Sequence, residues 1–170
     1  GDGGALFTND DELAEKSRII LAHGSKKRYE HKVIGINGRL DAIQAAILNV
    51  KLKYFPDEVQ KRKIIGQNYI DLLSEKGIKT PIIKDGRTSV YAQFTLQVEN
   101  RQEFIDKLKE NGVPTAIHYP KPLHLQECYA FLNYSKGDFP VAEKAAQEVF
   151  SLPMSPFLSD EHQRLITQLI

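Results

Sequence analysis

Apolar residues recur along this chain with two different periods, and each period predicts one kind of secondary structure. Between residues 40 and 54 the apolar positions lie three and four residues apart, as on one face of a helix. The positions on this face are Leu40, Ile43, Ile47, Val50 and Tyr54. Neighbouring alanines widen the face, so we expect this helix to be covered on more than one side. Pro56 interrupts it, and residues 57–76 predict a second, more polar helix that ends at Gly77.

The period changes to two near residue 90. From Val90 to Val98 every second side chain is apolar, which predicts a strand. The elements predicted after it are a helix at 100–112, a strand at 113–119, a helix at 139–150 capped by Asp138, an edge strand at 151–154 and a last helix capped by Ser159. Strands and helices in this order predict an α+β layer of sheet against helices.

The first 38 residues predict short elements around a cationic loop. We expect a strand at 5–7 and then a helix that Asn9 caps and Gly24 ends. The loop after it, residues 25–38, contains several basic side chains and leads directly into the predicted helix. Because binding residues concentrate in loops on a rigid scaffold, we interpret residues 23–44 as an anion-contacting loop fixed to a dimer or domain core.

Composition narrows the class of protein. The chain is 41% hydrophobic and 26% charged with a net charge of +1, which is typical of a globular protein and favours neither nucleic acid nor an anionic membrane as partner. No apolar run approaches the roughly 20 residues of a membrane span. The single cysteine, Cys128, suits a reducing compartment, so we expect a cytoplasmic protein. The chain begins at Gly1 without an initiator Met and ends in a helical pattern, so we expect a piece of a longer protein.

Several sequence blocks resemble the DegT/DnrJ/EryC1/StrS family of sugar aminotransferases, which use pyridoxal 5'-phosphate (PLP). The blocks are GDGGALFTNDDELAEK, HGSKKRYEHKVIGINGRLDAIQAAIL, SVYAQFTLQVENR, GVPTAIHYPKPLHLQ and GDFPVAEKAAQEVFSLPMSP. They cover nearly all of the chain in the family's order. The third and fourth blocks look closest to aminotransferases that act on UDP-linked 3-keto-glucuronic acid sugars.

The resemblance implies an α/β parent protein of PLP fold type I. Residues 1–38 would be the end of the large PLP-binding domain and an interface loop, residues 39–77 linking helices, and residues 78–170 a truncated α+β C-terminal small domain. The family's Schiff-base lysine precedes the GDGG motif, so it would lie upstream of Gly1. We therefore expect no catalytic residue in this chain, and no activity from the chain alone. The glycines at the start, Gly1, Gly3 and Gly4, would allow a tight backbone near that lysine.

Asn37 is the cofactor-binding residue that the resemblance implies. In the family this asparagine reaches across a homodimer interface to the PLP phosphate of the other subunit, where a carboxamide N–H and a helix N-terminus both suit a phosphate. The alternative is that Asn37 is the N-cap of the helix that follows. The two roles can coexist.

Four more residues are predicted to contact substrate from two places in the chain. Arg28 and Tyr29 would meet a carboxylate or diphosphate of a nucleotide-linked sugar, because the planar guanidinium fits both groups. The alternative is that the basic run around Arg28 is a solvated face, as we expect for Lys26 and Lys27. His118 and Tyr119 would reach the substrate in the adjoining active site, although a histidine that ends a strand is often a hydrogen-bonded structural residue.

His124 is a lesser substrate-binding candidate. Its spacing from His118 does not fit a metal pair on one helix face, and Cys128 adds little, so we expect no metal site. Arg39, beside Asn37, is expected to be structural, paired with Asp41, or else to contact a phosphate.

The resulting hypothesis is a PLP-dependent aminotransferase that acts on a nucleotide-linked keto-sugar in amino-sugar biosynthesis for a surface polysaccharide or glycan, with glutamate as the expected amino donor. Three alternatives stay open. One is a PLP-dependent sugar dehydratase of the same family, in which histidine replaces the lysine. Another is an aminotransferase for a 4-keto sugar. The third is a non-catalytic binding or assembly module.

Overall fold

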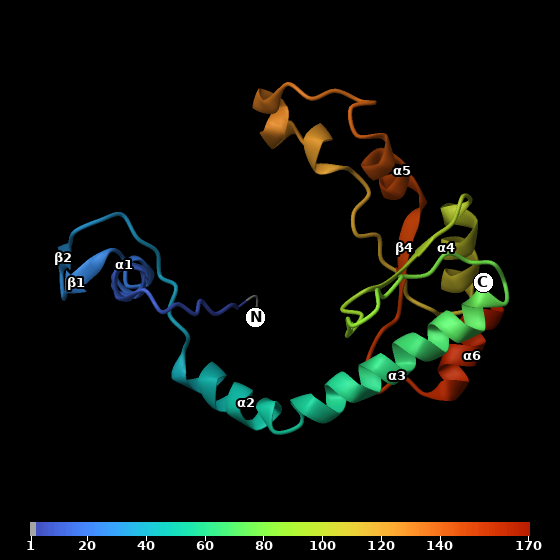
Figure 1. Cartoon of the computed structure of the whole chain (residues 1–170), viewed down its shortest axis with the longest axis horizontal. Helices are drawn as coiled ribbons and strands as arrows, with labels where there is room; N and C mark the ends of the chain where they lie inside the picture. Colours follow the sequence, from blue (N-terminus) through green and yellow to red (C-terminus); the bar gives the residue numbers. More distant parts are fainter. Residues whose placement is uncertain (1–2) are drawn as a thin grey trace. The chain divides into compact units, whose positions relative to one another are not determined.

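This computed structural model describes residues 3–170, which divide into two compact units, one within Gly1–Tyr54 and the other formed by Phe55–Ile170 (Figure 1). The backbone predicted to turn tightly at Gly1 lies outside the described residues. The division at residues 54 and 55 falls beside Pro56, where the helix was predicted to be interrupted. The three-part organisation with boundaries after residues 38 and 77 stays a prediction.

The first unit contains two helices and a small β-ribbon: α1 (Asp11–Leu21), β1 (Ser25–Lys27), β2 (Glu30–His31) and α2 (Ala42–Leu52). The strand predicted at 5–7 is wrong, since these residues have irregular backbone. The cap of α1 is Asp10 rather than the predicted Asn9, because Asp10 Oδ1 accepts the N–H groups of Glu12 and Leu13 at 2.9 and 3.0 Å. The expected loop at 25–38 contains the antiparallel pair β1–β2.

Helix α2 confirms the helical period but not the expected burial. None of its residues is buried within this chain. Large apolar side chains that are more than half exposed on or beside it are Leu40, Ile43, Ile47, Val50, Leu52, Tyr54 and Phe55. Within the described residues of its own unit, the apolar face of this helix is therefore left uncovered.

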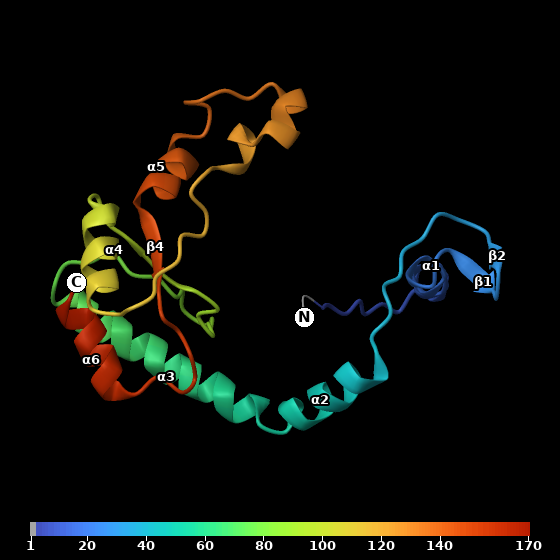
Figure 2. The same cartoon turned by 180° about the vertical axis from the view of Figure 1, so that it is seen from behind.

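The second unit is an α+β layer, as the sequence predicted. Its elements are α3 (Phe55–Ser74), β3 (Phe94–Gln97), α4 (Arg101–Glu110), the 3-10 helices η1 (Leu123–Leu125) and η2 (Glu127–Leu132), α5 (Pro140–Glu148), β4 (Val149–Leu152) and α6 (Asp160–Gln168). Strands β3 and β4 pair antiparallel, from Phe94 opposite Leu152 to Gln97 opposite Val149. Helices α3 and α6 lie side by side in both views (Figures 1 and 2), and Gln163 Nε2 donates to the Ile65 carbonyl at 2.8 Å between them.

The core of the second unit lies between the β3–β4 pair and helices α3, α4 and α6. Its fully buried apolar side chains are Tyr69, Leu73, Phe94, Leu96, Leu108 and Phe150. The Tyr69 hydroxyl donates to the Pro153 carbonyl at 3.1 Å, and burial raises the pKa of this hydroxyl. Burying this apolar surface is the main source of stability for the unit, at about 25 cal/mol per Å² removed from water.

Strand β3 is shorter than the strand predicted from residue 90, and a distant side chain is the reason. The Arg62 guanidinium donates to the carbonyls of Val90 and Tyr91 at 2.8 and 2.7 Å and takes these groups away from strand pairing. Tyr91 then adopts a positive φ of 45° and buries its ring, which the alternation had placed outside. A Cβ on Gly66 of α3 would lie 2.2 Å from that ring, so glycine is required there.

The strand predicted at 113–119 is reduced to one bridge between Ala116 and Ser151. Pro114 and Pro120 lack the N–H that a longer ladder needs. No helix among residues 3–170 is long and apolar enough to cross a membrane.

Candidate functional site

The predicted site residues fall into two groups, one in each unit. Arg28, Tyr29 and Asn37 belong to the loop after α1, while His118, Tyr119 and His124 belong to the segment between α4 and α5. We describe each group within its own unit.

The loop of the first unit is held to the C-terminal end of α1 by backbone hydrogen bonds. The N–H of Ile36 donates to the Ile20 carbonyl at 2.8 Å, the N–H of His23 donates to the Ile36 carbonyl at 2.9 Å, and the N–H of Gly38 donates to the Leu21 carbonyl at 3.0 Å. Asn37 is therefore fixed at its backbone on both sides. Its immediate neighbours carry the bonds, so its side chain has no part in anchoring the loop to α1.

Two glycines make this close approach possible. Gly24 has a φ of 74°, and a Cβ there would lie 1.7 Å from the Val33 carbonyl oxygen. A Cβ on Gly35 would lie 2.1 Å from the Gly24 nitrogen. Any larger residue would push the two backbone segments apart, so both positions require glycine.

The Asn37 side chain is exposed and does not cap a helix. The N-cap of α2 is Asp41, four residues further on, so the alternative that Asn37 caps this helix is wrong. Instead, Arg39 Nε donates to Asn37 Oδ1 at 3.1 Å. The expected pairing of Arg39 with Asp41 is absent from the ion pairs of residues 3–170. The Asn37 amide group is thus oriented by Arg39 and can donate to an anion.

The basic run beside β1 divides into paired lysines and an unpaired arginine. Lys26 forms an ion pair of 2.8 Å with Glu15, which lowers the pKa of that carboxyl, and Lys27 forms one of 2.8 Å with Glu30. Among residues 3–170, no carboxylate pairs with Arg28.

The Arg28 guanidinium lies instead over the Tyr29 ring, with Cζ 5.0 Å from the ring centroid. Tyr29 has a φ of 68° and is 80% exposed. Stacking on a ring leaves the N–H edge of a guanidinium able to bind a carboxylate or phosphate in a bidentate way. Of the three cations, Arg28 is the one placed to bind an external anion.

In the second unit, the segment between α4 and α5 lines an open cavity of about 870 Å³ together with residues of β3, α5 and β4. Thr95, His118, Tyr119, Lys121, His124 and Gln126 supply its main polar side chains. The apolar and aromatic part of the wall comes from Pro120, Pro122, Leu123, Tyr129, Leu132, Tyr134, Phe139, Ala142, Ala145, Ala146 and Val149. A mostly apolar cavity with a few convergent polar groups is the usual form of a small-molecule site.

His118 is oriented by hydroxyl groups of the sheet, and the neighbouring Tyr119 is free. His118 Nδ1 lies 3.3 Å from Ser151 Oγ, which shares a 2.9 Å hydrogen bond with Thr95 Oγ1. Tyr119 is 71% exposed, follows a cis peptide bond, and meets the His118 ring edge-on at 5.6 Å. The imidazole is thus held in place while the phenol is available to a ligand.

His124 lines the same cavity, but its ring is nearly buried and one of its two nitrogens is bonded to a carboxylate. Its Nε2 donates to Glu143 Oε1 at 3.0 Å, and the two side chains are only 8% and 11% exposed. The N–H of Gly137 donates to the same oxygen at 2.8 Å; this bond, aided by His124, lowers the pKa of Glu143.

Glu143, which bonds the cavity-lining His124, is a residue that the sequence did not single out. The sequence placed the cap of α5 at Asp138, but the N-cap is Phe139, with Pro140 as the first helical residue. An acidic residue in the first turn after such a proline favours contact with free N–H groups at the helix start. That signal was present in the sequence.

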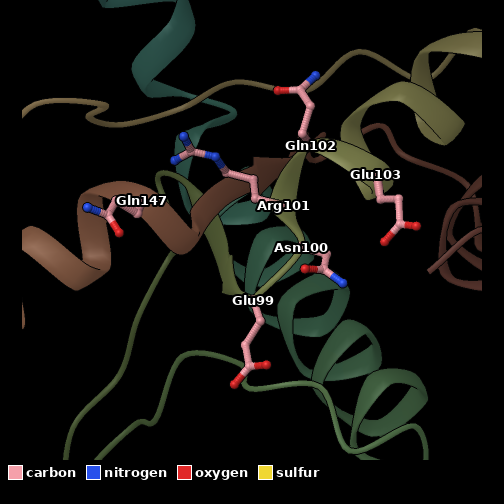
Figure 3. A pocket seen from close by; sticks show the side chains of 6 residues that line it. All are labelled: Glu99, Asn100, Arg101, Gln102, Glu103 and Gln147. Carbon is pink, nitrogen blue, oxygen red and sulfur yellow. The ribbon is translucent and has the colours of Figure 1, made fainter.

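A second hollow, of about 510 Å³, lies at the start of α4 (Figure 3). Its lining residues are Glu99, Asn100, Arg101, Gln102, Glu103 and Gln147. The Arg101 guanidinium is occupied, because Nη1 donates to the carbonyls of Ala146 and Val149 at 2.7 and 3.0 Å. With its cation bonded internally and two carboxylates on its rim, this hollow does not suit a phosphate. Across residues 3–170, no group of three or more His, Cys, Asp or Glu side chains is placed to hold a metal ion.

Comparison with protein families matches residues 1–170 to the DegT/DnrJ/EryC1/StrS aminotransferase family. A pleiotropic regulatory protein of Geobacillus stearothermophilus is 47% identical over 173 residues, covering all of this chain and 46% of the relative. The UDP-2-acetamido-2-deoxy-3-oxo-D-glucuronate aminotransferase of Pseudomonas aeruginosa is 47% identical over 166 residues, covering 98% of this chain and 45% of the relative. The chain thus spans less than half the length of these curated relatives.

Solved structures give the same fold. S. venezuelae DesV, in complex with a ketimine intermediate, matches with a TM-score of 0.88 and 34% identity over 95% of this chain and 44% of its own. NtdA from Bacillus subtilis, with bound cofactor PMP, matches with a TM-score of 0.81 and 29% identity over 95% of this chain and 39% of its own.

Proposed function

Because the chain belongs to the DegT/DnrJ/EryC1/StrS aminotransferase family, we propose that it works within a PLP-dependent enzyme that converts the keto group of a nucleotide-linked sugar to an amine. The observation that carries the proposal is the family match over the full chain, together with an exposed, oriented Asn37 in the loop where the family holds its cofactor. PLP, when bound, supplies the electron sink for such a reaction.

The donors present in this chain fit an anionic cofactor. The Asn37 carboxamide is exposed and held by Arg39, so its N–H can donate to a phosphate oxygen. We propose that it does so across the interface of a homodimer, to the PLP of the other subunit. The exposed apolar face of α2 supports such a dimer, because obligate interfaces resemble a domain core cut in half.

We assign the substrate to Arg28, Tyr29, His118 and Tyr119. Arg28 has its N–H edge available for a carboxylate or diphosphate, and Tyr119 stands exposed beside an oriented His118. The apolar wall of the 870 Å³ cavity would exclude water around the sugar nucleotide. His124, the lesser candidate, is left out of this proposed set because its side chain is only 8% exposed and its Nε2 is bonded to Glu143.

The substrate class that we favour is a UDP-linked 3-keto-glucuronic acid sugar. Support comes from the 47% identity to the Pseudomonas aeruginosa aminotransferase and from Arg28, which can bind a sugar carboxylate. Glutamate as the amino donor is part of the same proposal. We also propose a cytoplasmic location, because an exposed free thiol such as that of Cys128 suits a reducing compartment.

A regulatory role is the second candidate, because the 47% identical Geobacillus relative carries a regulatory name. The test uses the complete protein with PLP, glutamate and keto-sugars that carry the keto group at carbon 3 or carbon 4. Formation of an amino sugar and 2-oxoglutarate from the 3-keto-glucuronate substrate is expected. Turnover of the 4-keto sugar alone would overturn the substrate class, a deoxygenated product would identify a dehydratase, and no turnover of any sugar would favour the regulatory role.

A further inference from the structure

The Glu143 carboxylate joins the two ends of the segment 123–139. A single oxygen, Oε1, accepts hydrogen bonds from His124 Nε2 at 3.0 Å, from the Gly137 N–H at 2.8 Å and from the Phe139 N–H at 3.4 Å. His124 lies at the beginning of the segment, and the two amides lie at its end. One side chain of α5 therefore closes the segment into a loop.

Aromatic contacts continue from this bond into the segment. The His124 ring lies 4.8 Å from the Phe139 ring, and the Tyr134 ring meets Phe139 edge-on at 4.9 Å. Such contacts between rings are favourable in addition to the apolar area that they bury. The position of the Phe139 ring thus depends on both His124 and the bond to Glu143.

The rest of the segment has little to hold it. Its only regular elements are the short 3-10 helices η1 and η2, and it pairs with no strand. Phe131, Leu132 and Tyr134 are 72%, 47% and 49% exposed, so they bury little apolar surface that would fix the backbone. A segment with few buried contacts opens at low free energy. The bond from the Ser135 N–H to Asp138 Oδ2, at 2.8 Å, is local, whereas the bonds to Glu143 join the two ends of the segment.

The same segment forms much of the cavity wall. Leu123, His124, Gln126, Tyr129, Leu132, Tyr134 and Phe139 all line the cavity. We propose that Glu143 is a positioning residue, which acts through His124 to hold the segment 123–139 as the wall of this cavity, and that His124 does not itself bind substrate. The consequence for substrate affinity rests on the proposed function; the closure of the segment does not.

The experiment compares the complete wild-type protein with Glu143→Ala, His124→Ala and the double variant. Hydrogen exchange of backbone amides in 123–139 is expected to be roughly tenfold faster or more in each variant. Glu143→Ala removes the part-buried charged acceptor, and His124→Ala removes the donor that ties the start of the segment to it. Because both side chains belong to one bond, the double variant should exchange no faster than Glu143→Ala alone. Unchanged exchange in β3 and β4 shows that the unit remains folded.

Conservative variants and a control sharpen the comparison. His124→Gln keeps an N–H donor within reach of Glu143, and Glu143→Gln keeps an acceptor oxygen, so both should restore slow exchange in part. Glu127→Ala removes an exposed carboxylate from the same segment and should leave exchange unchanged. Wild-type exchange rates in Glu143→Ala would overturn the proposal.

The kinetic readout separates positioning from direct contact. Glu143→Ala and His124→Ala should raise the KM for the nucleotide sugar by similar factors, roughly tenfold, with kcat little changed. A raised KM in His124→Ala alone, without rescue by His124→Gln, would mean that His124 touches substrate and would overturn the proposal. Absence of turnover in the wild-type protein would overturn the proposed function but not the closure, which the exchange rates decide.

Discussion

Asn37 is the residue at which cofactor binding can be separated from helix stability. Since Asp41 is the N-cap of α2, Asn37→Ala should leave the stability of this helix nearly unchanged. The same change should weaken PLP binding in the complete protein, because a hydrogen bond to a charged acceptor is worth ~1.5–3 kcal/mol, or roughly ten- to a hundredfold in affinity. Stability is measured as the melting temperature of the apo-protein, and cofactor binding as the PLP dissociation constant.

Asn37→Asp tests the same contact by replacing the neutral amide with a negatively charged carboxylate. An aspartate would still accept from Arg39 Nε but would set a negative charge against the phosphate, so it should reduce PLP affinity more than alanine does. Wild-type affinity in Asn37→Asp would show that Asn37 does not touch the phosphate. Mixed dimers with a subunit that lacks the cofactor lysine would reveal whether the affected site is the partner's.

Gly66 offers a stability test in the second unit. Alanine in place of glycine inside a helix ordinarily stabilises by roughly 1 kcal/mol. Here the added Cβ would lie 2.2 Å from the Tyr91 ring, and overpacking of that kind costs about 1–3 kcal/mol. We therefore expect Gly66→Ala to lower the free energy of unfolding, measured by urea titration. Gln60→Ala, at an exposed position of the same helix, is the control; a gain in stability for Gly66→Ala would contradict the packing described.

The lowered pKa of the Glu143 carboxyl predicts that the free energy of unfolding depends on pH. The Gly137 N–H and His124 hold its folded-state pKa below the ordinary value of 4.5. A depressed carboxyl pKa adds stability above the unfolded-state pKa, and this contribution is lost as the pH falls through the folded-state pKa. The stability difference between wild type and Glu143→Gln should thus be largest above about pH 4.5 and shrink at lower pH. Urea titrations from neutral to acid pH measure this stability difference. A difference that grows at acid pH would contradict the lowered pKa of Glu143.

At the scale of elements, local pattern predicted the helices well and the strands poorly. Helix α2 and a break near Pro56 follow from spacing within a few residues, which periodicity captures, although the break itself lies at residues 53 and 54 and Pro56 is the second residue of α3. The start of β3 depends on Arg62, 28 residues earlier, which no local pattern contains. At α1 the sequence offers two adjacent cap residues, and propensity cannot choose between Asn9 and Asp10.

The candidate site also contains features that the sequence predicts and features that depend on contacts between distant residues. Arg28, Asn37, His118 and Tyr119 are proposed on the family resemblance, whereas the sequence did not predict the bonds of Glu143, whose partners lie four to 19 residues away. Sequence also could not show that Lys26 and Lys27 are paired while Arg28 is not, since Glu15 is brought to Lys26 only by the fold.

The exposed apolar face of helix α2 predicts that the complete protein forms a homodimer. Ile47 is 55% exposed in this chain, so Ile47→Asp should leave the unit itself folded. In a dimer interface the same change would bury an unpaired charge and should dissociate the complete protein, as measured by sedimentation at micromolar concentration. Asn49→Asp adds the same charge to the helix at a polar position and is the control. A wild-type protein that sediments as a monomer would contradict the homodimer.

At the scale of the whole molecule, the family resemblance predicts that this chain alone carries no cofactor lysine. After incubation with PLP and reduction by borohydride, we expect no lysine of the chain to be labelled selectively, and no transamination. Peptide mapping by mass spectrometry measures the labelling. Efficient modification of one lysine, accompanied by amino transfer, would contradict the assignment of the catalytic lysine to another part of the protein.

The anchoring of the loop after α1 has an evolutionary consequence. Its attachment uses main-chain groups near Gly24 and Ile36, and it demands glycine only where the two backbone segments touch. Arg28 and Tyr29, at its tip, form none of these main-chain bonds, whereas Lys26 beside them pairs with Glu15 of α1. Substitutions at the tip can therefore accumulate without a penalty in folding, and a tip exchanged between relatives should transfer preference for one sugar while the framework stays the same. Under the proposed function, Gly24 and Gly35 would mark the ends of the segment that can be exchanged.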